Sequence, residues 1–304
     1  MRNLIVDCNG GTCNRLGNIL LGHYLREKWS FDRIFVNWPR QFSCDARFRD
    51  CFQSPYSHGV FESDQGDGRR AVIEYFDNQI RMVDEYMFPQ YTMEEGNYLL
   101  ISKDIDKSIP HGDLLILIRN YLPQPVDEIR EAVSSFVNQH GIDSTWLGVH
   151  CRRTDRDNIN NEYYLQEIGR ILDETPHLRF FVCSDCCESE RLIQQAFPQN
   201  VVIRQKQRQP EPIIDQPGIK RFIFDDAAYQ RLVGLGWKDN HYAENAILGR
   251  KEKYNIYRSR GAVQEGICDL LILSQVRNIL RSVGSYFRLA SALIESREAT
   301  EHER

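Results

Sequence analysis

The sequence has no run of about 18 or more apolar residues, the length that a membrane-spanning helix requires. Its first residues, MRNLIVDCNGG, lack the apolar stretch of a secretory signal peptide, so we expect a cytoplasmic protein without a membrane span. An excess of positive charge is also lacking, because the formal net charge is −5 at pH 7. This charge, and the absence of zinc-finger and RRM patterns, disfavour a nucleic-acid partner.

Two common phosphate-binding signatures are missing as well. The chain has no GxxxxGK[ST] loop, and it has no GxGxxG turn between a strand and a helix. A kinase or sulfotransferase built around such a loop is therefore disfavoured.

The nine cysteines are an odd number and are spread over the chain, apart from the cluster Cys183-Ser-Asp-Cys186-Cys187. A zinc site would need a second compact pair of ligands, which the other spacings do not offer, so we expect no metal ion. Cysteines of a cytoplasmic protein are mostly reduced. Cys151 and Cys183 fall within predicted strands, where we expect them to be small core residues.

The chain does contain an alternation of strand-like and helix-like segments, which predicts the α/β class with parallel strands. Its 304 residues are enough for two domains. We place them at 1–143 and 144–304, with an irregular insertion at about 205–260. In the first we expect a strand at 4–6, a helix to about 29, strands at 33–38, 71–75, 98–101 and 114–118, and a helix from about 126 to 137.

The second half shows the alternation more clearly. We expect strands at 146–151, 179–184, 201–204 and 278–283. The expected helices cover 163–173, 188–197 and 262–275, and a last helix follows Gly284-Ser285. The charged tail 295–304 is expected to fray.

The stretch WLGVHCRRTD, residues 146–155, joins an apolar strand to a group of polar side chains. Ligands of open α/β sheets bind beyond the carboxyl ends of the strands, where His150, Arg152 and Arg153 should lie. A forked, permanently charged guanidinium at that place suits a phosphate or a carboxylate. The alternative is that these arginines are solvated or are paired with Asp155 and Asp157.

Two strand-to-helix turns are candidate phosphate sites. Ser282-Val-Gly284-Ser285 combines a hydroxyl with the bare N–H groups of a helix start, and with Arg152 nearby it would hold a diphosphate. Gly10-Gly11 has the same geometry, although a simple tight turn explains it equally well.

Single acidic residues complete the candidate set in the second half. Asp185 follows a predicted strand. Asp269 lies within a predicted helix, where it is either an acceptor for the edge of a guanine base or a solvated helix carboxylate.

In this order, these motifs resemble the fucosyltransferase superfamily that includes the bacterial nodulation α1,6-fucosyltransferase, the core α1,6-fucosyltransferase of animals and the protein O-fucosyltransferases. The resemblance rests on GVHCRRTD, EGICDLLILSQ and SVGSYFRLASALI, at 148–155, 265–275 and 282–294. FVCSD at 181–185 and GGTCNRLGN at 10–18 support it.

The resemblance implies a GT-B enzyme, with two Rossmann-like domains that face each other across a cleft. The first would be the acceptor side, the second would bind GDP-fucose, and no metal cofactor would be needed. By position, Arg152 corresponds to the family's β-phosphate ligand, and Arg153 and Asp155 to residues that brace the same loop or contact the sugar. Ser285 and Tyr286 correspond to the diphosphate contacts.

The same comparison assigns the other residues of the donor site. Asp269 corresponds to the base-binding aspartate, and His150 lines that pocket. The remaining candidate donor-binding residues are Asp185, Ser282 and Gly284 in the second domain and Gly11, Asn14 and Arg15 in the first.

The sequence departs from the family at two places. Tyr286 stands where the animal α1,6 enzymes have Gln, and the segment after Asp155 lacks the expected Gly-Thr-Glu. Glu162 or Asp157 is therefore our candidate general base.

We accordingly predict an inverting, metal-independent glycosyltransferase that transfers fucose from GDP-fucose to a hydroxyl group of a glycan or glycoconjugate. The alternatives are a transferase that uses another GDP-sugar and a non-catalytic GT-B-like protein that binds a glycan or a nucleotide.

Overall fold

The computed structural model describes residues 1–40, 43–53, 59–63, 68–77, 79–83, 94–100, 109–152, 161–206, 211–212, 256–282 and 284–302. The described residues up to Val126 form one compact unit, and those from Asp127 onward form a second. Each unit has its own parallel sheet. The predicted α/β class is therefore confirmed.

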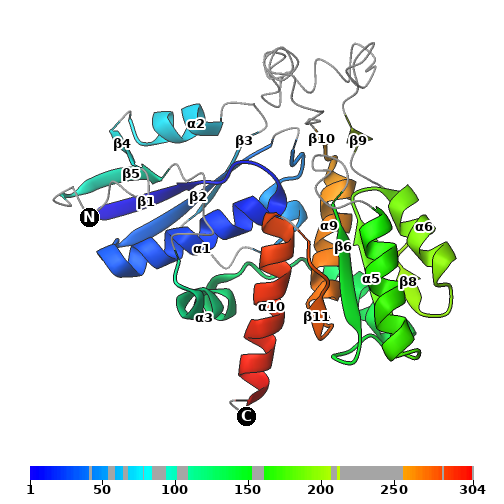
Figure 1. The fold of residues 1–304 in the computed structure, drawn as a ribbon. Coiled ribbons are helices and arrows are strands. Elements are labelled where there is room, and N and C mark those ends of the chain that lie inside the picture. The colour runs from blue at the N-terminus through cyan, green and yellow to red at the C-terminus, as the bar shows by residue number, and fades with distance from the viewer. Residues whose placement is uncertain are drawn as a thin grey trace, which may run out of the picture. The chain divides into compact units, whose positions relative to one another are not determined.

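The first unit is built on a five-stranded sheet in the order β3-β2-β1-β5-β4, in which all neighbours are parallel. Helix α1 packs against β1 and β2, whereas α2 packs against β2 and β3 (Figure 1). The elements are β1 (Arg2–Asp7), α1 (Thr12–Trp29), β2 (Arg33–Pro39), the 3-10 helix η1 (Phe48–Asp50), β3 (Val60–Ser63), α2 (Gly68–Tyr75), β4 (Ile80–Val83), β5 (Gly96–Leu100) and α3 (His111–Tyr121).

Two segments predicted as strands are helices. The apolar run Leu114–Ile118 lies within α3, which begins after Pro110 and buries Leu117 and Ile118 while Ile116 is 49% exposed. A short apolar run has no periodicity that distinguishes a strand from a buried helix, so the sequence prediction was wrong here. The segment 71–75 was also wrong, because it lies within α2.

The second unit contains a four-stranded parallel sheet in the order β11-β6-β7-β8. The strands that were predicted around 146–151, 179–184 and 201–204 are confirmed, and the strand predicted at 278–283 is shorter. The elements are α4 (Asp127–His140), β6 (Leu147–Cys151), α5 (Asn161–Glu174), β7 (Phe180–Ser184), α6 (Cys187–Ala196), β8 (Val201–Ile203), β9 (Glu211–Pro212), β10 (Ile256–Tyr257), α9 (Arg260–Leu273), β11 (Asn278–Ile279) and α10 (Ser285–His302).

Helix α4 belongs to the second unit, so the division falls between Val126 and Asp127 rather than at the boundary of 143 and 144 expected from the sequence. Its buried side chains are Ile129 and Val133, and it packs extensively on α9. A helix is therefore assigned to a unit by the surface that covers its apolar face, which local sequence does not reveal.

The C-terminal helix does not fray at residue 295 but continues to His302. Arg297 anchors this part of α10, because its guanidinium donates to the carbonyl oxygens of Ser274 at 2.8 Å and Val276 at 3.0 Å. Ser296 is buried as well.

The core of the second unit brings the helices close to β6. Cys151 and Cys183 are buried in β6 and β7, as predicted. Gly148 permits a very close approach, because a Cβ at this position would lie 2.7 Å from the Cδ2 atom of Leu273 in α9. β6 and α9 are thus held as one packed body.

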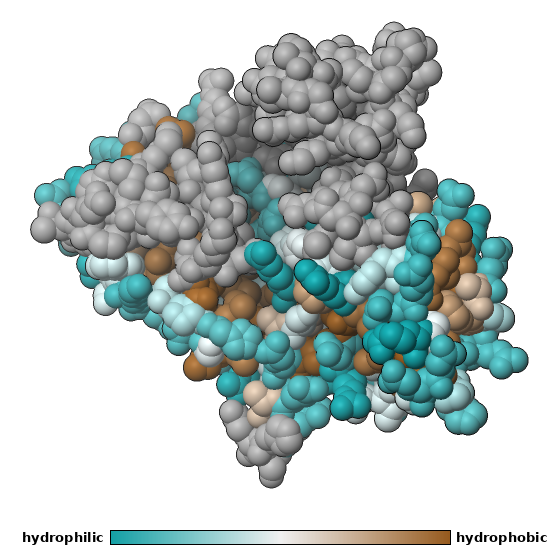
Figure 2. Space-filling model, in the orientation of Figure 1, coloured by the Kyte–Doolittle hydropathy of each residue, from teal (hydrophilic) through white to brown (hydrophobic). Residues whose placement is uncertain are grey.

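The surface of the described residues mixes hydrophilic and hydrophobic side chains on the face drawn in Figure 2. Large hydrophobic side chains that are clearly exposed are single ones, such as Tyr75, Ile116 and Leu192. Within the described ranges, no helix combines the length and the apolar character needed to cross a bilayer.

Candidate functional site

The four-stranded sheet changes its winding direction at β6. The chain moves from β6 through α5 to β7 and through α6 to β8, and α9 then precedes β11 on the other side of β6 (Figure 1). Ligands of parallel α/β sheets bind beyond the carboxyl ends of the strands at such a switch point. The residues that follow β6 and β11 therefore form the candidate site.

Arg152 comes directly after β6, and its guanidinium lies against Gly284, which precedes α10. A Cβ at residue 284 would lie 2.7 Å from Nη1 of Arg152 and 3.6 Å from Cζ. Gly284 also has a φ of +95°, a backbone conformation that residues with a Cβ rarely adopt. The structure thus brings Arg152 to the glycine turn, as the sequence predicted, and a Cβ at residue 284 would force the guanidinium to move.

The turn leads into a helix start. Ser285 is the first residue of α10, which has 18 residues. The first N–H groups of a helix have no acceptor within the helix, and they carry the positive end of its dipole. Together with the charge of Arg152, this arrangement suits an anion such as a diphosphate.

His150 is buried beside this turn and is held in one orientation. The hydroxyl of Ser282 donates to the carbonyl oxygen of His150 at 2.7 Å, and its Oγ lies 3.2 Å from Nδ1 of the ring. Because the hydroxyl has one hydrogen, Oγ accepts from Nδ1–H. The hydroxyl of Tyr164 donates to the same carbonyl oxygen at 3.1 Å.

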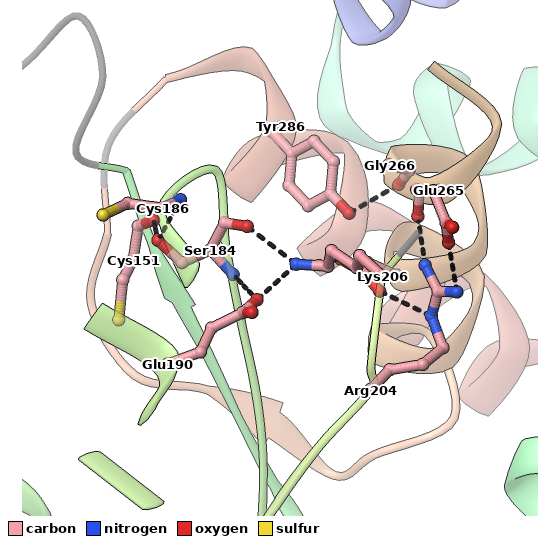
Figure 3. Close-up of polar contacts among 10 residues, drawn as sticks. Cys151, Ser184, Cys186, Glu190, Arg204, Lys206, Glu265, Gly266 and Tyr286 are labelled. Carbon is pink, nitrogen blue, oxygen red and sulfur yellow. Dashed lines mark hydrogen bonds and ion pairs between the residues drawn. The ribbon is translucent and has the colours of Figure 1, made fainter. Parts of the chain in front are cut away.

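Tyr286 covers the ring of His150. The two rings are nearly parallel, with centroids 4.3 Å apart and an interplanar angle of 17°. The hydroxyl of Tyr286 donates to the carbonyl oxygen of Gly266 in α9 at 2.8 Å (Figure 3). Tyr286 therefore links the end of β6 to α9, and its contact with a diphosphate stays a prediction.

Asp269 lies in a buried network of ion pairs between α9, α6 and the residues after β8. Its Oδ2 is 2.8 Å from Nζ of Lys206, and its Oδ1 accepts from Nε of Arg204 at 3.0 Å. Lys206 also pairs with Glu190, and Arg204 pairs with Glu265 (Figure 3). The aspartate that the resemblance assigned to base binding is thus an internal counterion for two cations.

The pKa values of this network reflect burial opposed by close charges. Burial raises the pKa of Glu190 to about 7, although Lys206 acts in the opposite direction. For Lys206 and Arg204, burial favours the neutral form, but the carboxylate of Asp269 and its acidic neighbours outweigh burial and raise both pKa values. Both cations therefore keep their charge.

The end of β7 is tied to the same network. The backbone N–H of Ser184 donates to Oε1 of Glu190 at 2.6 Å, and Nζ of Lys206 donates to the carbonyl oxygen of Ser184 at 2.7 Å. The Ser184 hydroxyl donates to the carbonyl oxygen of Cys151 at 2.6 Å. Asp185 follows directly and is half-buried.

The candidate residues of the first unit have different environments. Gly11 caps the start of α1, and Asn14 is exposed in its first turn. Arg15 is fully buried: its Nε donates to the carbonyl oxygen of Gly10 and its Nη1 to that of Pro39, both at 2.7 Å. Arg15 therefore braces the turn after β1, and its role in donor or acceptor binding stays a prediction.

Of the candidate bases and loop residues after Arg152, Glu162 alone has a described environment. Arg153, Asp155 and Asp157 lie outside the described residues. Glu162 is exposed in the first turn of α5, and its Oε1 accepts from Nε2 of Gln166 at 3.2 Å. The general base therefore stays a prediction.

Sequence reasoning missed Glu190, Arg204 and Lys206. Arg204 and Lys206 fall at the end of a short strand and at the start of a segment with no recognisable pattern, and Glu190 lies on an amphipathic helix with many charges. The only available signal was that charged residues follow β8 at the edge of the sheet where ligands bind. In the described part of the chain, no three His, Cys, Asp or Glu side chains are grouped so that they could hold a metal ion.

The sequence matches no protein-family model and no curated protein. Solved structures, however, share its fold. NodZ α-1,6-fucosyltransferase soaked with GDP-fucose superposes with a TM-score of 0.56 and 13% identity, over 96% of this chain and 92% of NodZ. Fucosyltransferase NodZ from Bradyrhizobium gives 0.55 and 14%, over 95% and 91%.

A mutant of Arabidopsis thaliana FUT1 in complex with GDP is similar to the same extent, with a TM-score of 0.57 and 8% identity, over 96% of this chain and 68% of FUT1. Identities this low establish the fold and not the activity. The chain thus has the GT-B-like α/β fold of these fucosyltransferases, as the sequence motifs predicted.

Proposed function

We propose that this protein is an inverting glycosyltransferase that transfers fucose from GDP-fucose to a hydroxyl group of a glycan or glycoconjugate. The single observation that carries the proposal is the contact of Arg152 with Gly284 at the start of α10. The solved structures with this fold include one soaked with GDP-fucose and one in complex with GDP, which supports the choice of donor.

In the proposed reaction, the oxygen of the acceptor hydroxyl attacks C1 of fucose. The bond between C1 and the β-phosphate oxygen breaks, and GDP leaves with the bonding electrons. Negative charge then grows on the diphosphate. The guanidinium of Arg152 and the first N–H groups of α10 are already oriented to stabilise that charge, which lowers the barrier without a metal ion.

The proton of the acceptor hydroxyl needs a base. Glu162 and Asp157 are the proposed candidates, because both are carboxylates close in sequence to the end of β6. Arg153 and Asp155 would brace the loop or contact the sugar, and Asp185 and Ser282 would line the donor site. Gly11 and Asn14 are the proposed contributions of the first domain, the acceptor side.

The experiment is a thermal-shift series with GDP, GDP-fucose, GDP-mannose, UDP and CMP. A ligand that binds only the folded protein stabilises it in proportion to the logarithm of its concentration over its dissociation constant. We expect GDP and GDP-fucose to raise the melting temperature and UDP and CMP to have no effect. Protection by UDP alone would refute the donor class.

Catalysis is tested by release of GDP from GDP-fucose in the presence of a glycan mixture. The variant Arg152→Lys keeps the positive charge but loses the forked guanidinium, and we expect turnover to fall by about 100-fold, the size seen when one transition-state donor is removed. The matched control is Arg170→Lys on the exposed face of α5, where Arg170 pairs with Glu167 and Glu174. Loss of turnover in both variants would argue against a specific role of Arg152.

A further inference from the structure

We propose that Ser184, at the end of β7, is a positioning residue that orients Arg152 through the carbonyl group of Cys151. This inference rests on the proposed function, because it concerns how the guanidinium is aimed at the departing diphosphate. It also gives a role to the buried ion pairs around Lys206, which the proposed reaction does not use.

The first argument is the peptide unit that Ser184 holds. Cys151 and Ser184 are partners in the parallel register of β6 and β7. The hydroxyl of Ser184 donates to the carbonyl oxygen of Cys151 at 2.6 Å (Figure 3). That carbonyl belongs to the planar peptide unit that also contains the nitrogen and Cα of Arg152. A hydrogen bond that fixes this plane therefore fixes the point from which the side chain of Arg152 starts.

The second argument is the direction of the hydroxyl. The Oγ of Ser184 accepts from the N–H of Cys186, the residue before α6, at 3.0 Å (Figure 3). A serine hydroxyl has a single hydrogen, which is then directed at the carbonyl oxygen of Cys151. The hydroxyl is thus held from two sides.

The third argument is the ion-pair network that holds the backbone of Ser184. Its N–H donates to Glu190 and its carbonyl oxygen accepts from Lys206, two side chains that pair with each other and are each 3% exposed (Figure 3). Lys206 continues the network to Asp269 in α9. Apolar side chains in place of a buried ion pair are often as stable or more stable, so stability alone does not explain this cluster. We infer that the network keeps Ser184 in place.

The fourth argument is that the preceding carbonyl of β6 is fixed in the same manner. The carbonyl oxygen of His150 accepts from the hydroxyls of Ser282 and Tyr164. Side-chain hydroxyls therefore hold both of the last two peptide units before Arg152. A group that stabilises charge in a transition state must be oriented in advance, and hydrogen bonds from a surrounding layer of residues supply that orientation.

The experiment compares release of GDP from GDP-fucose by Ser184→Ala, Ser184→Thr and the wild type, with a glycan mixture as acceptor. We expect Ser184→Ala to lower kcat by about 10-fold and to change KM for GDP-fucose by less than about 3-fold, because the charge that Arg152 meets is largest in the transition state. Ser184→Thr keeps the hydroxyl and should restore most of the turnover. The matched control is Ser274→Ala, at a buried serine whose hydroxyl donates to the carbonyl oxygen of Leu271 at 2.7 Å; it should lower the melting temperature without lowering kcat.

A double-mutant cycle separates positioning from a general weakening of the fold. If Ser184 acts through Arg152, Ser184→Ala costs less than about 3-fold in kcat in the Arg152→Lys background, because the guanidinium that it orients is already gone. If Ser184→Ala lowers kcat by the same factor in both backgrounds, or retains the kcat of the wild type, the assignment to Ser184 is wrong. If the wild-type protein itself releases no GDP, the proposed function has failed, and this inference fails with it.

Discussion

The ring centroids of Tyr286 and His150 lie 4.3 Å apart with the rings nearly parallel, and the hydroxyl of Tyr286 donates to the carbonyl oxygen of Gly266 in α9. A tyrosine in the first turn of α10, the helix proposed to bind the diphosphate, is thereby used as a structural bridge. Phenylalanine would keep the stacking but lose the hydrogen bond. The substitution Tyr286→Phe therefore separates the contribution of the ring stacking from that of the hydrogen bond.

For Tyr286→Phe we expect a loss of about 1 kcal/mol in the free energy of unfolding, since one hydrogen bond is removed and the carbonyl of Gly266 keeps its helical partner. GDP affinity should change by less than about 3-fold, because the phenolic oxygen faces α9 and not the phosphates. Chemical denaturation and calorimetry measure the two effects. The control is Tyr75→Phe, whose side chain is 64% exposed and should change neither. A large loss of GDP affinity without destabilisation would show that the hydroxyl serves the ligand.

The second prediction concerns Gly284. In Gly284→Ala, the new methyl group would occupy space within 2.7 Å of Nη1 of Arg152, and the residue would keep an unfavourable φ of +95°. We expect a loss of about 1–2 kcal/mol in stability from the backbone alone and a fall of about 10-fold or more in GDP affinity, because Arg152 is displaced.

Gly169→Ala is the matched control for that variant. Gly169 lies inside α5, and a Cβ there would be 3.9 Å from the nearest atom, in the ring of Phe197. Alanine is a better helix former than glycine by about 1 kcal/mol, so this variant should be as stable as the wild type or more stable. Equal losses of GDP affinity in both variants would contradict the role given to Gly284.

The third prediction is a pH dependence of stability from Glu190. Its pKa is about 7 in the folded protein against an ordinary value of 4.5, so the folded state binds a proton more readily than the unfolded chain. This contribution is fully present below pH 4.5 and is lost as the pH rises to 7 and above. The difference between the two pKa values corresponds to on the order of 3 kcal/mol in the free energy of unfolding.

Glu190→Gln tests this assignment, because glutamine does not titrate and still accepts from the N–H of Ser184. We expect the unfolding free energy of the variant to decline less between pH 4.5 and 7.5 than that of the wild type, as measured by urea denaturation at each pH. Glu174→Gln, at a side chain that is 72% exposed, is the control and should reproduce the wild-type slope. An unchanged slope in Glu190→Gln would place the titrating group elsewhere.

The sequence predicted the parts of the fold in which local pattern and tertiary context agree. The strand that ends at Cys151 and the turn at Gly284 were correctly placed, since an apolar run before polar residues and a glycine at a helix start each have one favourable structure. The segment Leu114–Ile118 was wrongly predicted as a strand, because all its residues are apolar and only the packing of Leu117 and Ile118 reveals a helix.

The contacts of the candidate site also differ in how far the sequence predicts them. Arg152 and Gly284 are 132 residues apart, and their contact follows from the order of the strands in a parallel sheet, which the alternation of elements implies. The pairing of Lys206 with Glu190 and Asp269 depends on side-chain directions of three separate elements. No local pattern encodes such a pairing, so the sequence did not predict the ion pairs of Asp269, and its role in base binding stays a prediction.

The last prediction concerns Gly148, which sets the distance between β6 and α9 and hence between Arg152 and the network around Asp269. In Gly148→Ala, the Cβ would lie 2.7 Å from Cδ2 of Leu273 and 3.1 Å from Cγ2 of Val276. We expect a loss of about 1–3 kcal/mol in unfolding free energy, because overpacking forces strand and helix apart. In Gly266→Ala, where a Cβ on α9 would meet nothing within 4 Å, stability should stay equal or rise by up to about 1 kcal/mol. Urea denaturation of both variants decides: if Gly148→Ala is as stable as Gly266→Ala, then β6 and α9 adjust easily and their spacing does not hold Arg152 in place.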